Sequence, residues 1–98
     1  MEWTIYMSRK AQDQIKNLHN EDVLCAIRLL VDCLKTKGPI PGRQWKNYSK
    51  LTTKKSEDKR HCHLVNGKPT YVCCWEVINK KKRVIEVYYV GTHEKAPY

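Results

Sequence analysis

The chain has no apolar run that approaches the roughly 18 residues of a membrane-spanning helix. Its first residues, MEWTIYMSRK, lack the apolar stretch and cleavage site of a signal peptide. We therefore expect a soluble, cytoplasmic protein. Acidic residues are also few, with 10 Asp and Glu against 19 Lys and Arg. Its formal net charge of +9 favours a nucleic acid, an acidic protein or an anionic membrane surface as partner.

The cysteines show no C-x-x-C spacing, and their number, five, is odd. Both features argue against the disulfide framework of an exported protein, so we expect free thiols. No internal repeat is visible, and 98 residues are enough for one domain with one modest core. The sequence therefore predicts a single domain spanning residues 1–98.

Apolar residues in the first half of the chain follow first a strand period and then a helix period. Alternation over residues 3–7 predicts a short strand, and Ser8 is placed to cap a helix after it. Helical spacing predicts two amphipathic helices, separated by a break at His19–Asn20, from the following residues: Ala11, Ile15 and Leu18, then Val23, Ile27, Leu30 and Leu34. The segment KGPIPG, residues 37–42, predicts the end of the second helix.

The second half of the chain is typical of antiparallel strands. Asn66-Gly67 between two alternating runs predicts a hairpin with a type I′ turn. A two-residue turn there would set His61 opposite Val72 and His63 opposite Thr70. Both histidines would then share a face with Cys74 and Glu76, while the other face would carry Leu64, Tyr71, Cys73, Trp75 and Val77. A loop at residues 79–81 would add Ile85, Val87 and Tyr89 to that apolar face, and Glu86 and Tyr88 to the histidine face.

The predicted fold is therefore α+β. An N-terminal strand and two helices precede a three-stranded antiparallel meander, and the helices pack on one face of the sheet. The other face, which carries the histidines, is left open to a partner.

Residues 60–98 combine three of the four histidines, a terminal tyrosine and many cations. Histidine has the unperturbed pKa nearest neutrality, whereas lysine and arginine mainly bind phosphate, so this combination indicates acid–base chemistry on a polyanion such as RNA. His19 we interpret as an ordinary surface residue. A zinc site made from His61, His63 and Cys74 is an alternative, because imidazole and thiolate suit that ion, although no fourth ligand is evident.

The segments WKNYSKL, RHCHLVNGKPTYVCCWEV and VIEVYYVGTHEKAPY resemble the RelE/ParE superfamily of bacterial toxins. They are most similar to its RelE-like mRNA interferases, which belong to type II toxin–antitoxin systems. The resemblance covers essentially the whole chain and implies a RelE-like fold. It also implies translation inhibition by an endoribonuclease that enters the ribosomal A site, cleaves mRNA without a metal or other cofactor, and is neutralised by an antitoxin protein. A membrane partner is not implied.

The resemblance also implies roles for individual residues. His61 and His63 match two lysines of RelE toxins, and either histidine would take the proton from the attacking 2′-OH. His93 would protonate the leaving 5′-oxygen, and Tyr98 would stack on a base. Cations that would bind RNA and compensate phosphate charge are Arg43, Lys46, Lys50, Arg60, Arg83 and Lys95. Arg60 or Arg83 would replace an arginine that relatives carry near positions 71–72.

Two other functions remain open from the sequence. A ParE-type protein would inhibit DNA gyrase without nuclease chemistry, and a decayed toxin would bind RNA without cleaving it. The histidines and Tyr98 favour the nuclease, because a protein that only binds needs no proton-transfer groups on one face.

Overall fold

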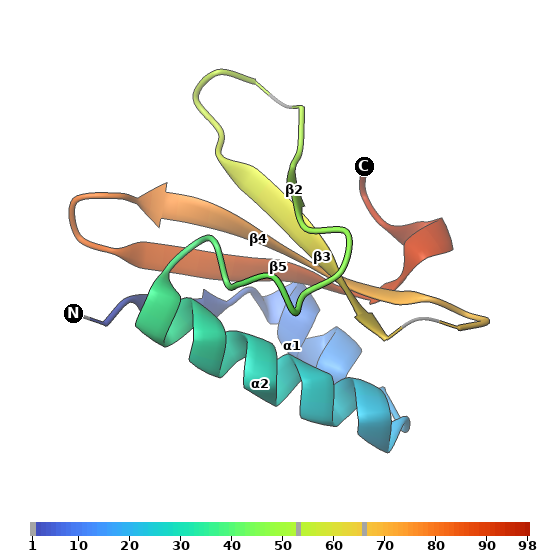
Figure 1. The fold of residues 1–98 in the computed structure, drawn as a ribbon. Helices are drawn as coiled ribbons and strands as arrows, with labels where there is room; N and C mark the ends of the chain where they lie inside the picture. The colour runs from blue at the N-terminus through green and yellow to red at the C-terminus, as the bar shows by residue number, and fades with distance from the viewer. Residues whose placement is uncertain (1, 53, 66) are drawn as a thin grey trace.

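The computed structural model describes residues 2–52, 54–65 and 67–98 and shows two helices packed on one face of a sheet (Figure 1). The helices are α1 (Arg9–Lys16) and α2 (Glu21–Lys37), and a short 3-10 helix, η1 (His93–Lys95), follows the last strand. The strands are β1 (Thr4–Met7), β2 (Ser49–Lys50), β3 (Lys59–Val65), β4 (Tyr71–Asn79) and β5 (Val84–Thr92). Neither helix of the described part of the chain has the length and apolar character needed to cross a membrane.

Both helices begin where the sequence predicts and α2 also ends there, whereas α1 ends at Lys16, before the predicted helical residue Leu18. The Ser8 hydroxyl accepts a hydrogen bond from the Ala11 N–H at the start of α1, and the Asn20 side chain accepts from two N–H groups of α2. Such caps satisfy donors that have no partner inside the helix. Gly38 ends α2 with a φ of 84°, which a glycine adopts without steric cost. The four predicted apolar residues of α2 are all buried: Val23, Ile27, Leu30 and Leu34.

The α+β class is confirmed, but the prediction that the sheet is a three-stranded antiparallel meander is wrong. The sheet has five strands in the order β1-β5-β4-β3-β2, and it is mixed because β1 runs parallel to β5. The β1–β5 pair joins the two ends of the chain, and no local pattern reveals a pairing of that kind. β2 has only two residues, too few to show a strand period, so no pattern in the sequence predicts it.

The register between β3 and β4 also differs from the prediction. His61 pairs with Cys74 and His63 with Val72, so the register is shifted by two residues. The connection over residues 66–70 is longer than a two-residue turn; Asn66, half of the predicted type I′ turn, lies outside the described residues. Because side chains alternate with a period of two, a shift of two leaves both histidines on the predicted face.

An irregularity in the β4–β5 pairing places one residue on the opposite face from the prediction. Trp75 pairs with Val87 but Cys74 pairs with Tyr89, so β5 carries an extra residue at this point. Tyr89 therefore packs with Val72 and Cys74 on the histidine face, whereas the sequence predicts it in the core between sheet and helices. The turn is also longer than predicted, since Asn79 pairs with Val84.

The main core lies between the helices and the sheet and has Trp75, Leu30 and Leu34 among its largest fully buried side chains. A second, small cluster of Val72, Cys74 and Tyr89 lies on the open face of the sheet. All five cysteines are free thiols, as predicted.

Candidate functional site

Four aromatic rings that the sequence singles out lie together on the sheet face opposite the helices. The His61 and Tyr98 ring centroids are 4.5 Å apart, and those of His63 and His93 are 5.6 Å apart. His93 and Tyr98 are separated by 5.8 Å, and His61 and His63 by 6.4 Å. We call these four residues the ring cluster. It is assembled from β3, η1 and the C-terminal tail, which lies above the sheet on the side away from α1 and α2 (Figure 1).

Hydrogen bonds at the end of β5 position His93. The His93 N–H donates to the Thr70 carbonyl at 2.8 Å, which ties η1 to the chain just before β4. The Tyr89 hydroxyl donates to the Thr92 carbonyl at 2.7 Å. A Cβ atom at Gly91 would lie 2.6 Å from the Tyr89 hydroxyl oxygen, so a side chain at residue 91 would displace that phenol. Glycine at this position therefore permits the bond that anchors the start of η1.

His61 is held in a buried position that favours its neutral form. Only 8% of the residue is exposed, and its Nδ1 lies 3.1 Å from the Ser49 hydroxyl. Burial lowers the pKa of His61 below its ordinary value of 6.5, a hydrogen bond to the Ser49 backbone partly opposes this, and the nearby charges of His63 and His93 lower the pKa further. A histidine that stays neutral at physiological pH is able to accept a proton.

His63 is fixed by the loop that runs beside the edge of β3. Its backbone N–H donates to the Lys46 carbonyl at 2.8 Å, and its ring Nε2 lies 3.3 Å from the Asn47 side-chain nitrogen. Asn47 has a φ of 56°, a left-handed conformation that asparagine tolerates better than most residues. Sequence reasoning missed Ser49 and Asn47, because nothing local indicates that this loop contacts the histidines.

Tyr98 is half exposed and lies against His61, so it is accessible to a ligand on the open face. Burial of its hydroxyl raises the pKa of Tyr98 above its ordinary value of 10.0. The phenol is therefore protonated at neutral pH. It is suited to stacking or to donating a hydrogen bond, and unsuited to accepting a proton from a substrate.

Of the six cations that the sequence proposes for RNA binding, two belong to segments that the structure joins to the ring cluster. Lys46 bonds to the His63 backbone through its carbonyl, and Lys95 is exposed in η1 with His93. Arg43 is exposed in the loop that leads to Lys46. Lys50 pairs with Arg60 across β2 and β3, and its ammonium lies 3.8 Å from the Asp58 carboxylate. Arg83 belongs to the turn between β4 and β5, and this turn lies at the end of the sheet opposite η1 (Figure 1).

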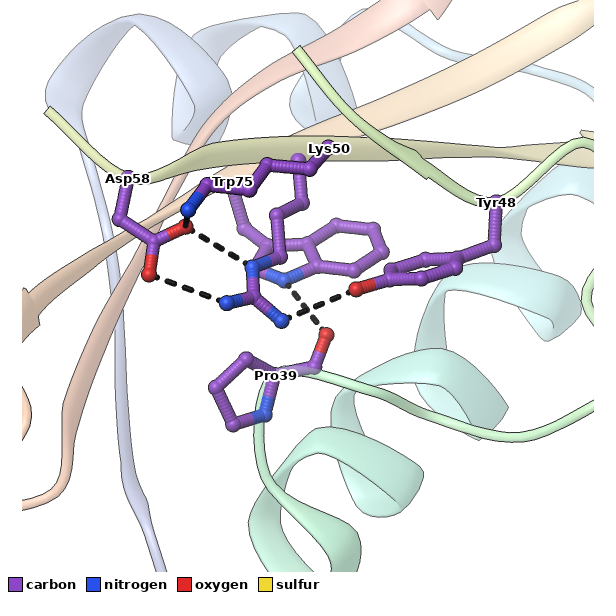
Figure 2. Close-up of polar contacts among 6 residues, drawn as sticks. Pro39, Tyr48, Lys50, Asp58 and Trp75 are labelled. Carbon is purple, nitrogen blue, oxygen red and sulfur yellow. Dashed lines mark hydrogen bonds and ion pairs between the residues drawn. The ribbon is translucent and has the colours of Figure 1, made fainter. Parts of the chain in front are cut away.

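The structure does not bring Arg60 to the ring cluster, contrary to the prediction. Its guanidinium donates to both carboxylate oxygens of Asp58, at 2.9 and 3.0 Å, and to the Tyr48 hydroxyl at 2.9 Å (Figure 2). Tyr48 in turn stacks on Trp75, whose indole N–H donates to the Pro39 carbonyl. The Arg60 bond lowers the pKa of the Asp58 carboxyl. Arg60 follows the strand period to the face opposite His61, and there it joins β3 to the loops.

The zinc alternative does not fit the geometry. The part of the chain that the structure describes contains no group of three or more His, Cys, Asp or Glu side chains arranged to hold a metal ion.

No protein-family model, curated protein or solved structure matches this chain. The function of the ring cluster therefore has to be inferred from its own geometry and chemistry. It offers a neutral imidazole and two further imidazoles, which are groups suited to moving protons, beside a protonated phenol that is suited to stacking or donating a hydrogen bond.

Proposed function

We propose that the protein is a metal-independent endoribonuclease that cleaves mRNA, and that it is the RelE-like toxin of a type II toxin–antitoxin module. The observation that carries this proposal is the ring cluster, in which three imidazoles and a phenol from separate segments lie within 4.5–6.4 Å of their neighbours. The resemblance of the sequence to RelE-like interferases supports the choice of RNA. The net charge of +9 supports a polyanionic substrate.

The reaction is an attack of a ribose 2′-oxygen on the adjacent phosphorus. In our proposal His61 takes the 2′ proton, because its lowered pKa keeps the imidazole neutral. The bond from phosphorus to the 5′-oxygen breaks, and His93 gives a proton to that oxygen. The products are a 2′,3′-cyclic phosphate and a 5′-hydroxyl, so protons and electrons balance without a metal or another reagent.

The other two rings bind and orient the nucleotide. His63, between His61 and His93, donates a hydrogen bond to a phosphate oxygen, and Lys46 and Lys95 add positive charge nearby. Tyr98 stacks on a splayed base and thereby aligns the 2′-oxygen with the phosphorus. In the cell, we propose, the ribosome presents the mRNA and an antitoxin protein covers the open face when the toxin is silent.

The proposal is tested by expressing the chain from a tightly controlled promoter and mapping mRNA ends as growth stops. We expect new ends carrying 2′,3′-cyclic phosphates, and a loss of cleavage of about a hundredfold or more in His93→Gln, the range typical of a lost general acid. His19→Gln, an exposed histidine outside the ring cluster, is the control and should cleave normally.

Two other outcomes would overturn the nuclease. Growth arrest with intact mRNA and blocked DNA replication would indicate a ParE-type gyrase inhibitor. Expression of folded protein without any arrest would indicate a decayed toxin that binds RNA and does not cut it.

A further inference from the structure

A pocket of about 330 Å³ lies beside the ring cluster and has no role in the chemistry proposed above. Its wall is formed by one side of α2, by the loop before β2 and by the end of β3. The lining residues are Leu29, Cys33, Gln44, Trp45, Lys46 and the segment 63–65. His63 belongs both to this pocket and to the ring cluster, where its ring is 5.6 Å from that of His93. A group bound here would therefore lie next to the reacting phosphate.

The lining combines apolar surface with a small number of polar groups. Leu29 is an exposed leucine, with 57% of its surface accessible, at the mouth of the pocket. Trp45 contributes a flat indole, and its N–H is buried with no hydrogen-bond partner among the described residues. This N–H has almost no solvent-accessible surface, so a ligand's acceptor reaches it only if the indole tilts toward the pocket, and the N–H then gains a bond. The Gln44 amide offers further donors and an acceptor at the wall.

A nucleobase matches this combination of surfaces. It has flat apolar faces for the indole and leucine, and hydrogen-bond acceptors along its edge. A sugar ring is puckered and surrounded by hydroxyl groups, so it covers an indole less well than a flat base does, and an aliphatic side chain of a protein has neither a flat face nor a hydrogen-bond acceptor. Lys46 at the wall supplies a cation for the phosphate that accompanies a base.

We infer that this pocket binds one base of the RNA substrate and so contributes to the choice of cleavage site. The inference rests on the proposed nuclease function and adds a specificity site to it: the base of a nucleotide flanking the cut enters the pocket, while its phosphate lies toward His63.

The test uses nuclear magnetic resonance of the whole protein, because the indole N–H of each of the three tryptophans gives its own signal. The Trp45 signal is identified by its disappearance in Trp45→Phe. The protein is titrated with the nucleoside 5′-monophosphates AMP, GMP, CMP and UMP, and with ribose 5-phosphate, which lacks a base. We expect at least one nucleotide to shift the Trp45 signal and ribose 5-phosphate to leave it in place. The Trp75 signal is an internal reference, since its N–H is already bonded to Pro39.

A matched pair of variants localises the binding. Leu29→Gln removes apolar surface from the mouth of the pocket and should weaken nucleotide binding about threefold or more. Ile40→Gln makes the same kind of change at another exposed residue, outside the pocket lining, and should leave binding unchanged. Both side chains are exposed, so neither variant is expected to unfold the protein.

Three results would overturn the inference: no nucleotide moves the Trp45 signal, ribose 5-phosphate moves it equally, or Ile40→Gln weakens binding as much as Leu29→Gln. The first result would instead suit an antitoxin side chain as the occupant. Failure of the pocket inference can be told apart from failure of the nuclease proposal. A base-dependent Trp45 shift in a protein that cuts no RNA leaves the pocket standing, whereas RNA cleavage with an unmoved Trp45 signal removes the pocket alone.

Discussion

Among single residues, His61 has the most informative environment. It is the most buried member of the ring cluster, and burial is the main reason that its pKa is lowered. Ser49 holds one ring nitrogen, and Tyr98 covers part of the ring. These contacts give the imidazole one preferred protonation state and one orientation, and a proton acceptor needs both.

This environment makes the stability of the protein depend on pH. The folded state binds a proton at His61 less readily than the unfolded chain, whose histidine has the ordinary pKa of 6.5. The contribution of His61 to the free energy of unfolding is therefore complete above pH 6.5 and is lost as the pH falls from there through the folded pKa. The free energy of unfolding, measured by urea denaturation, should fall less between about pH 7.5 and about pH 5 in His61→Gln than in the natural protein.

The comparison has a control variant, His19→Gln, and another group with a lowered pKa, Asp58, acts in a different pH range. His19→Gln should keep the full drop, because His19 is exposed and outside the ring cluster. Asp58 also has a lowered pKa, but its loss of stability begins only below its ordinary value of 3.8. An equal drop in the His61→Gln variant and the natural protein would contradict this account of the histidine.

Arg60 shows how one position in a strand decides between two roles. The sequence suggests it as an RNA ligand, yet a residue adjacent to His61 on a strand must point to the other face. The strand period alone was enough to reject that suggestion. In the structure Arg60 is 9% exposed and makes three charged hydrogen bonds with Asp58 and Tyr48.

We therefore predict that Arg60 acts in stability. Arg60→Lys keeps the charge but loses the two-pronged geometry that guanidinium offers a carboxylate, and it should lower the free energy of unfolding by about 2 kcal/mol. Arg43→Lys, at an exposed position, should change it by less than about 0.5 kcal/mol. Chemical denaturation measures both. An unchanged Arg60→Lys protein would mean that the Asp58 and Tyr48 bonds contribute nothing to folding.

At the scale of elements, the helices were predictable and the sheet was predictable only in part. Helix limits follow from local signals, namely the caps Ser8 and Asn20 and the terminating Gly38. Strand pairing depends on turn lengths and irregularities, and the extra residue at Tyr88–Tyr89 leaves no mark in the sequence. The histidine face was nevertheless correct, because the register error was two residues and the period is also two.

The candidate site was predictable to a similar degree. Alternation placed His61 and His63 on one face, and the resemblance to RelE-like toxins pointed to His93 and Tyr98. The residues that hold the imidazoles, Ser49 and Asn47, come from a loop whose path is set by tertiary contacts. Local sequence carries no information on such contacts.

The C-terminal tail is the element whose function is easiest to test. In our proposal Tyr98 acts through its ring, by stacking on a base. Tyr98→Ala should therefore lower the rate of RNA cleavage roughly tenfold or more, since base–aromatic stacking is worth about 1–3 kcal/mol per base. Tyr98→Phe keeps the ring and should retain most of the rate.

The pair also separates stacking from proton transfer. If Tyr98→Phe lost as much activity as Tyr98→Ala, the hydroxyl would be the active group and the stacking role would be wrong. The free energy of unfolding should stay within about 0.5 kcal/mol in both variants, because the residue is half exposed at the chain end.

At the scale of the whole molecule, the excess of positive charge should dominate the affinity for RNA. Each phosphate that a lysine or arginine neutralises releases counterions, so affinity falls with salt in proportion to the number of contacts. With roughly five phosphate contacts on a single strand, a fourfold rise in salt should weaken binding about a hundredfold. Fluorescence anisotropy with a labelled RNA that carries a 2′-deoxy sugar at the cleavage site measures this without turnover.

The same measurement separates the contribution of the surface charge to the affinity for RNA from the contribution of the pocket beside His63. Leu29→Gln should change the affinity for RNA while leaving its salt dependence intact, because it alters no charge. An affinity that hardly varies with salt would contradict a phosphate-based mode of binding and would favour a protein partner.

The space above Gly91 has a consequence for any attempt to infer activity from residue identities. One methyl group there would meet the Tyr89 phenol, and this phenol fixes the carbonyl from which the His93 turn begins. A chain with a larger residue at position 91 would keep every histidine, the same sheet and the same final tyrosine, yet His93 would no longer be aligned with His61. The catalytic geometry would then depend on the absence of a Cβ atom at residue 91, and a list of the reactive side chains would not reveal the difference.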